Sequence, residues 1–431
     1  MYAYSESRGL SVSKTTFCTA DVRFSERPSG ETILSYGLLL VFLLFLYANP
    51  ALLFPALGDV RPTQLVAAAA LGMLFIEKMA GRQSLTLVWP ESHLILAFLG
   101  AAGLSCLTAL WSRYALENLQ DLAKFVAVYF LIVNCINSER RLGAILWAMV
   151  IGGLFPALGA AHNYWNSAVV EGRTTWIGIF GNPNDLAASL VFLIPLAIAV
   201  GSDLRPWLRP AAWAIVAALI AAILLTFSRG GILGLIAVLV MLALHHGSVT
   251  RRVLTMILLV ASLLFISFFW SRGEGFSHLS QDFTAHQRLT TIQVGLAMFQ
   301  DHPLFGVGLG CSVIGWPLYA PPNLSNKWLH NHNTFVQVLS ETGIAGFIPF
   351  VLLLIAALRD ARRVAASCQE FGRERMARLT AALEVSLWGF LVCAMAGGIA
   401  LTWFPYLLIG AVSAAKSVAL GELADSHAVE N

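Results

Sequence analysis

Long apolar segments recur along almost the whole chain, and short polar connections separate them. Each segment has about 20 residues, the length that a helix needs to cross the hydrocarbon core of a bilayer. Of the 431 residues, 58% are hydrophobic and 12% are charged. A soluble domain of this size needs more polar surface. We therefore predict an all-α, polytopic integral membrane protein.

Twelve segments have the composition of transmembrane helices, and one large polar segment separates the ninth from the tenth. These spans are residues 33–55, 62–79, 91–110, 119–137, 141–161, 184–202, 210–227, 230–246, 253–270, 343–359, 380–400 and 403–420. They divide the chain into a tail (1–32), spans 1–9 (33–270), a large loop (271–342), spans 10–12 (343–420) and a second tail (421–431). Because the first tail is polar and charged, we expect no cleavable signal peptide in it.

Basic residues divide unevenly between the two sides of this topology. With the N-terminus in the cytoplasm, 19 of the 27 Lys and Arg residues fall on cytoplasmic segments and 8 on the opposite side. Every cytoplasmic connection then carries a basic pair or cluster, apart from the C-terminal tail with Lys416 alone. Cytoplasmic loops typically carry an excess of Lys and Arg. We therefore expect both termini in the cytoplasm and the 271–342 loop in the periplasm of a Gram-negative cell.

Several classes of site and partner are not expected. The six cysteines form no CxxC pair, which argues against a structural disulfide or a zinc site. No carboxylates and histidines cluster at metal-ligand spacing, so we expect neither a metal ion nor another cofactor. The net charge of +3 is small and scattered, so nucleic acid is not an expected partner. The run 306–310, Gly-Val-Gly-Leu-Gly, follows no strand and is therefore not a nucleotide-binding loop.

Three parts of the chain form the outer surface of this topology: the loop 162–183, the tight turn 228–231 and the loop 271–342. In the long loop, apolar residues recur at helical spacing over 287–300, which predicts a short amphipathic helix resting on the membrane or on the bundle. A loop of this length with helical content is typically functional.

The long loop ends on a histidine motif, and His332 is the predicted general base. Residues from Asn333 onward are typical of a helix, so His332 lies near a helix N-terminus, where the dipole disfavours imidazolium. A neutral ring can accept a proton, and a positioned base contributes about 10²- to 10⁴-fold to a rate. We expect His330, Asn333 and Gln337 to support it. The alternative is that His332 only caps the helix or lies among lipid headgroups.

Three arginines on the same side are candidate ligands of an anion. Arg288 begins the predicted amphipathic helix, where the dipole disfavours a cation, so a bound diphosphate would explain its position. Arg173 precedes Asn184, and we expect Asn184 or Asp185 to cap the sixth span. Arg229 lies at the junction of two spans, where an arginine needs a partner. Each arginine could instead only contact solvent or headgroups.

Four motifs in this order and spacing, over about residues 160–350, resemble the superfamily of O-antigen ligases and O-antigen polymerases, which are bacterial inner-membrane glycosyltransferases. The motifs are Gly178-Ile179-Phe180-Gly181-Asn182-Pro183-Asn184, Thr226-Phe227-Ser228-Arg229-Gly230-Gly231, the segment from Arg288 through His302-Pro303-Leu304-Phe305-Gly306-Val307-Gly308-Leu309-Gly310, and the segment from His332-Asn333-Thr334-Phe335 through Glu341-Thr342-Gly343.

The resemblance implies a GT-C-like, metal-independent transferase of the cell inner membrane, with an undecaprenyl-diphosphate-linked glycan as donor and a periplasmic active site. It implies that His332 is the catalytic base and that Arg288 and Arg173 hold the diphosphate, with Arg229 as a further candidate. The short C-terminal tail resembles the ligase, whose acceptor is a lipid A-core sugar. Two alternatives stay open: a polymerase on the same carrier, and a polysaccharide transporter or flippase. The polar groups gather on one face, which favours surface chemistry over transport.

Overall fold

The computed structural model describes residues 32–170, 172–245 and 283–430, together with residues 253, 256, 257 and 260. Over these ranges the chain is helical and contains no strand beyond one isolated bridge, Val170 to Arg173. The all-α prediction is therefore confirmed for this part of the chain. Residues 1–31 of the predicted N-terminal tail and nearly all of the ninth predicted span, 253–270, lie outside the described residues.

The helices before the long loop are α1 (Ile33–Ala48), α2 (Pro50–Leu53), η2 (Pro55–Leu57), α3 (Pro62–Ala80), α4 (Glu91–Ser105), α5 (Ser112–Cys135), α6 (Glu139–Trp165), η3 (Gly178–Phe180), α7 (Pro183–Val191), α8 (Leu193–Gly201), η4 (Pro206–Leu208), α9 (Arg209–Leu225) and α10 (Arg229–His245). Those that follow are α12 (Phe283–Asp301), α13 (Ser312–Tyr319), η6 (Ser325–Lys327), α14 (Thr334–Glu370), α15 (Glu374–Ala394) and α16 (Trp403–Glu430).

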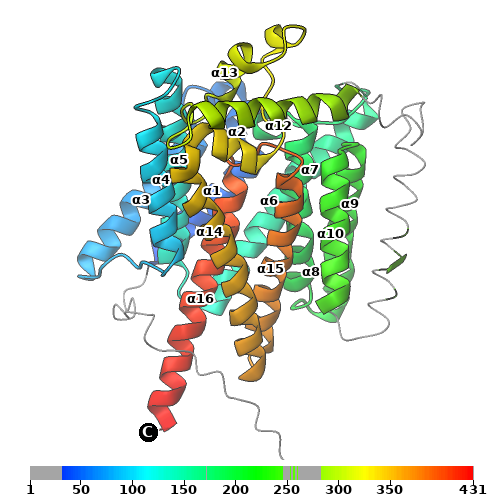
Figure 1. Cartoon of the computed structure of the whole chain (residues 1–431). Coiled ribbons are helices and arrows are strands. Elements are labelled where there is room, and N and C mark those ends of the chain that lie inside the picture. The colour runs from blue at the N-terminus through cyan, green and yellow to red at the C-terminus, as the bar shows by residue number, and fades with distance from the viewer. Residues whose placement is uncertain are drawn as a thin grey trace, which may run out of the picture.

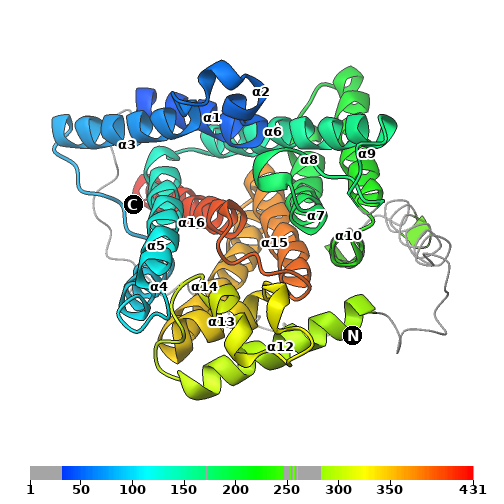
Figure 2. The same ribbon diagram turned by 90° about the horizontal axis from the view of Figure 1, so that it is seen from above.

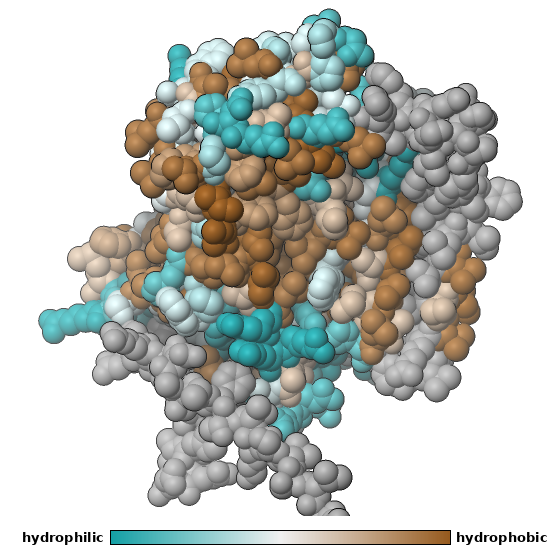
Figure 3. Space-filling view, in the orientation of Figure 1, coloured by the Kyte–Doolittle hydropathy of each residue, from teal (hydrophilic) through white to brown (hydrophobic). Residues whose placement is uncertain are grey.

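Seven helical segments in the described ranges are long and apolar enough to cross a membrane. They correspond to the predicted spans 2, 5, 6, 7, 10, 11 and 12. The predicted spans 1, 3 and 8 form the shorter apolar helices α1, α4 and α10. Most of the predicted span 4 lies within α5, whose first 13 residues include four charged ones. Figure 3 shows a broad hydrophobic band around the middle of the molecule, with hydrophilic residues above and below it.

Local backbone chemistry divides two of the predicted spans. The apolar run 33–55 does not stay helical, because Asn49 adopts a left-handed conformation (φ 47°) and Pro50 begins a new turn. The span 184–202 divides into α7 and α8, since the ring of Pro195 disfavours a helical bond to the carbonyl four residues earlier. Ser386 of α15 donates to the nearby carbonyl of Phe192 at 2.7 Å. A kink in α14 at Gly343 (φ 61°, ψ −164°) stands where the predicted span 10 begins.

The long helices form one bundle, and α12 lies across one end of it (Figure 1). Seen along the bundle, α12 and α13 lie together beside α14 and α15 (Figure 2). The predicted helix at 287–300 is thus confirmed, with bounds that extend to 283 and 301. We refer below to the end that carries α12 as the α12 end.

Ion pairs join the helices at the opposite end. Arg375 of α15 pairs with Glu139 at 2.9 Å and with Asp203 at 2.6 Å. Lys416, predicted in a C-terminal tail, instead lies buried in α16, where it pairs with Asp360 of α14 and lies 3.4 Å from Glu91 of α4. That prediction was wrong, because α16 continues to Glu430 and packs Lys416 against α14 and α4.

Candidate active site

The residues just before α14 form a well-defined helix cap. Asn333 Oδ1 accepts hydrogen bonds from the backbone N–H groups of Phe335 (3.0 Å) and Val336 (3.1 Å). Such a cap satisfies two of the N–H groups that a helix start leaves without an intrahelical partner. Asn333 Nδ2 donates to the carbonyl of Met395 at 3.2 Å. His332 is therefore the residue directly before the cap. The cap side chain binds both the start of α14 and the carbonyl of residue 395.

The connection between α15 and α16, residues 395–402, is a fourth part of the α12 end. Thr334 Oγ1 donates to the Gly397 carbonyl at 2.7 Å and accepts from the Ile399 N–H at 3.0 Å. The carbonyl of Asn331 lies where a Cβ on residue 398 would stand, so glycine is needed there. This segment was not predicted from the sequence, because it carries no charge. The Gly397-Gly398 pair could have indicated a close approach of two backbones there.

The glycine-rich turn 303–310 packs into the kink of α14. At the kink, backbone groups of α14 pair with the turn instead of with their own helix. The N–H groups of Ile344 and Ala345 donate to the carbonyls of Pro303 (2.9 Å) and Leu304 (3.1 Å), and the N–H of Val307 donates to the Ser340 carbonyl at 2.9 Å. The backbone of Gly343 lies in a region that only glycine readily adopts. This pairing explains why the turn motif and the Glu341-Thr342-Gly343 motif occur together.

Glu341 anchors the long loop to α14. Its side chain is 2% exposed, and its carboxylate accepts from the Gly310 N–H at 3.0 Å and from the Ser312 hydroxyl at 2.6 Å. Because Ser312 begins α13, the carboxylate also lies at the positive end of that short helix. Glu341 is thus engaged in structure. Within the described residues, no three His, Cys, Asp or Glu side chains are grouped so that they could hold a metal ion.

Gln337 and Asn331 are two polar residues close to His332 in the sequence. Asn331 is buried, and its Nδ2 donates to the Ser340 hydroxyl at 3.2 Å. The amide oxygens of both residues are buried without a hydrogen-bond partner in the part of the chain that the structure describes. Gln337, which we expected to support His332, contacts the backbone near Gly398. Gln337 thus packs α14 against residues 395–402, and the Asn331 side chain packs against Gly295 of α12.

Arg173, Asn184 and Ser228 come together from three separate segments. Asn184 Oδ1 accepts from Arg173 Nη2 at 2.7 Å and from the Ser228 hydroxyl at 2.8 Å. Arg173 Nε donates to the Thr226 carbonyl at 3.1 Å. Asn184 does not cap the sixth span as expected. Asn182 is the cap, and it accepts from the Asn184 N–H at 2.8 Å because Pro183, which has no N–H, occupies the first helical position.

Burial, together with nearby charges, keeps the ring of His332 neutral. Burial is the largest cause that lowers the pKa of His332, to about 4, and the positive charges of Arg288, His330 and Arg173 lower it further. The neutral ring was expected, but from the helix dipole; the structure assigns it mainly to desolvation and neighbouring cations. Arg288 and Arg173, 115 positions apart in the chain, therefore act on one ring. We call His332, Arg288 and Arg173 the basic cluster.

The positions of the remaining candidates differ from the sequence predictions. Arg288 is the sixth residue of α12, not its first, because the helix begins at Phe283. Arg288 therefore does not lie at the helix start, where the dipole would disfavour its charge. His330 is exposed. Arg229 begins α10 directly after Ser228, so it lies beside the Arg173–Asn184 contact, although its charge is not among those acting on His332.

The fold and the site define a helical, multi-pass membrane protein that holds a neutral histidine among arginines at one end of its bundle. Residues 214–351, about a third of the chain, match the family described as O-Antigen ligase. The predicted resemblance to the superfamily of O-antigen ligases and polymerases is thereby confirmed. The match includes Arg229, Arg288 and His332, and it supports a membrane enzyme of this type over a transporter. No curated protein matches the chain.

Proposed function

We propose that the chain is a glycosyltransferase that moves an O-antigen glycan from undecaprenyl diphosphate to a sugar of the lipid A-core, at the periplasmic face of the inner membrane. The observation that carries the proposal is the basic cluster: a neutral histidine next to a capped helix start, with two guanidinium charges close enough to lower its pKa. The match to the O-antigen ligase family supports the substrate class.

His332 acts as the general base in this proposal. As the acceptor hydroxyl oxygen attacks the anomeric carbon of the donor glycan, its proton passes to the imidazole. A neutral imidazole is required for this step, and the low pKa of His332 supplies it at neutral pH. The Asn333 cap fixes the backbone beside the ring, so that the base is positioned before the acceptor binds.

Arg288 and Arg173 stabilise the leaving group. The bond between the anomeric carbon and the diphosphate oxygen breaks with its electron pair on the diphosphate, and guanidinium groups bind phosphate oxygens in pairs. Asn184 and the Thr226 carbonyl hold Arg173 in place. Attack on the face opposite the leaving group inverts the anomeric configuration and leaves no covalent glycosyl-enzyme. Because the arginines supply the positive charge, the proposal needs no metal ion.

A test of the base compares three histidines of the α12 end. Purified protein is given a lipid-linked glycan and lipid A-core, and transfer is measured by gel mobility of the product. His332→Ala should lose at least about 10²-fold in kcat. His330→Ala should lose far less. His162→Ala is the matched control, since His162 is exposed at the end of α6 and contacts Asn166. Retained activity in His332→Ala would remove the proposed base.

The same assay separates the ligase from the polymerase and tests the metal-free mechanism. A second lipid-linked glycan replaces lipid A-core in a parallel reaction, and the acceptor that gains sugar identifies the reaction. Extension of the lipid-linked glycan alone would make the chain a polymerase. Activity should persist in EDTA; loss in EDTA that Mg²⁺ or Mn²⁺ restores would contradict the mechanism.

A further inference from the structure

A second site lies at the end of the bundle opposite α12. A cavity of about 1100 Å³ opens between α8, α9 and α10 on one side and α14 and α15 on the other. It lies far from the basic cluster along each helix, since α9 and α15 both cross from this end to the α12 end. None of the residues proposed for transfer lines it.

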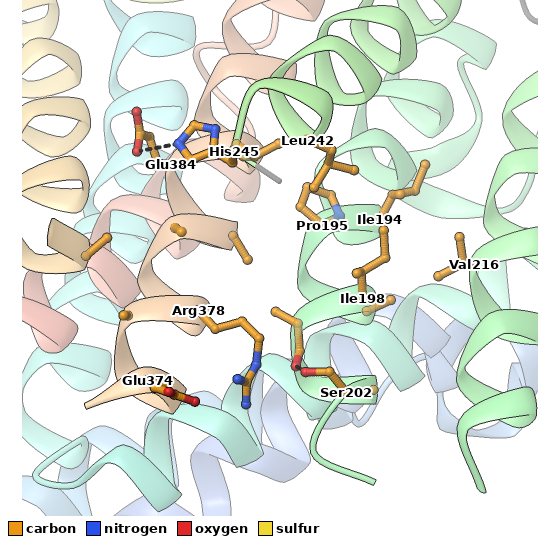
Figure 4. A pocket seen from close by; sticks show the side chains of 18 of the residues that line it. Ile194, Pro195, Ile198, Ser202, Val216, Leu242, His245, Glu374, Arg378 and Glu384 are labelled. Carbon is orange, nitrogen blue, oxygen red and sulfur yellow. Dashed lines mark hydrogen bonds and ion pairs between the residues drawn. The ribbon is translucent and has the colours of Figure 1, made fainter. Parts of the chain in front are cut away.

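One wall of this cavity is apolar. It consists of side chains from α8 and α9, including Ile194, Pro195, Ile198 and Val216, and Figure 4 shows them facing the opening from one side. Ligand sites are typically lined by apolar residues with a few placed polar groups. In a hydrophobic helix bundle, an apolar wall of this size is suited to a hydrocarbon chain.

The end of the cavity nearest the polar surface is basic. Arg378 lies there with the carboxylate of Glu374, and Arg209 donates to the Ser202 carbonyl at the same end (Figure 4). Arg362 also lines the cavity, and its charge acts on His245. Arg378 forms an ion pair with Asp203, and its Nε is buried without a hydrogen-bond partner among the described residues. A buried donor without a partner costs free energy, which a bound acceptor such as a phosphate oxygen would recover.

A polar pair marks the other end of the cavity. His245 of α10 lies 3.3 Å from Glu384 of α15, and the Glu384 side chain is only 6% exposed. Figure 4 shows this pair at one end and Arg378 with Glu374 at the other. Ionisable residues inside a helix bundle often mark a functional site. Here they place hydrogen-bonding groups along the wall opposite the apolar side chains.

We propose that this cavity binds an anionic phospholipid of the surrounding leaflet, with its phosphate at the arginines and an acyl chain along α8 and α9. Basic pockets between transmembrane helices are known sites for anionic lipid headgroups. The charge and the apolar wall together select an amphiphile, because a free anion would use only the basic end. The inference is independent of the proposed transferase activity.

The test is a titration of the full-length protein, stripped of lipid in detergent, with phosphatidylglycerol and with phosphatidylethanolamine, read by native mass spectrometry. The double variant Arg209→Gln/Arg362→Gln is compared with Arg205→Gln/Arg363→Gln. The two variants have the same net charge, but Arg205 and Arg363 do not line the cavity. Ala381→Trp places an indole in the cavity without changing any charge.

We expect one phosphatidylglycerol to bind about tenfold more tightly than phosphatidylethanolamine. The Arg209/Arg362 variant should weaken its binding about thirtyfold, since each basic residue contributes about fivefold, and the control variant less than threefold. Ala381→Trp should remove the site for both lipids. Equal affinity for the two lipids, equal losses in both double variants, or binding unaffected by Ala381→Trp would overturn the proposal. Displacement of the lipid by inorganic phosphate at similar concentration would instead make it a site for a soluble anion.

Discussion

The low pKa of His332 predicts that transfer resists acid far better than an ordinary histidine base would allow. The perturbation is a change of pH from 7.5 to 5.5. With a pKa of about 4, about 97% of the ring is still neutral at pH 5.5, whereas a histidine at its ordinary pKa near 6.5 would be only about 10% neutral. The value of kcat/KM, which reports the substrate-free enzyme, should therefore change less than twofold.

The assay measures initial rates of transfer to lipid A-core across pH 4 to 8, with circular dichroism to confirm that the protein stays folded. Bound diphosphate is negative and favours the imidazolium, so the acid limb of kcat should lie at higher pH than the limb of kcat/KM. Arg288→Gln removes the second-largest cause of the low pKa and should move the kcat/KM limb upward. A tenfold fall of wild-type kcat/KM by pH 5.5, in folded protein, would refute the argument from burial.

Three substitutions test the groups around the base. Arg288→Lys should lower kcat/KM about tenfold, because an ammonium does not bind two phosphate oxygens as a guanidinium does; wild-type kinetics would mean that Arg288 supplies only charge. Asn184→Ala should lower kcat/KM about 10- to 100-fold, since Arg173 loses a charge-assisted hydrogen bond of about 1.5–3 kcal/mol; an unchanged KM and kcat would remove Arg173 from donor binding. Asn333→Ala should destabilise the fold by about 2 kcal/mol in a thermal melt, from the lost cap and the bond to residue 395. Exposed Asn323 is its control, and an equal effect of Asn323→Ala would contradict the cap argument.

Local features of the sequence predicted the helices well and their ends less well. Apolar runs depend only on composition, so ten of the twelve predicted spans reappear as apolar helices. The break at Asn49-Pro50 could have been predicted, because a proline disfavours a helical conformation in the residue before it. The separation of α7 from α8 at Pro195 was harder to predict, because Pro156 and Pro349 lie inside α6 and α14, which continue past them.

Three of the predicted site residues interact in the structure. His332 was selected from its place before a helix among Asn and Gln residues, and Arg288 and Arg173 because basic residues are disfavoured on the outer side of the membrane. The charges of both arginines lower the pKa of His332. Glu341 entered the sequence prediction only as part of a family motif. Its contacts with Gly310 and Ser312 depend on a turn 30 residues away, which no local pattern encodes.

The sequence by itself determined the class of this protein, its helices and the residue types available for chemistry, because hydrophobic periodicity and charge placement are local properties. The tertiary structure decided which of those residues meet. Asn184 joins two segments 55 positions apart, and the uncharged residues 395–402 support the start of α14. It also decided the protonation of His332, since burial and the distances to other charges, which set a pKa, exist only once the helices have packed.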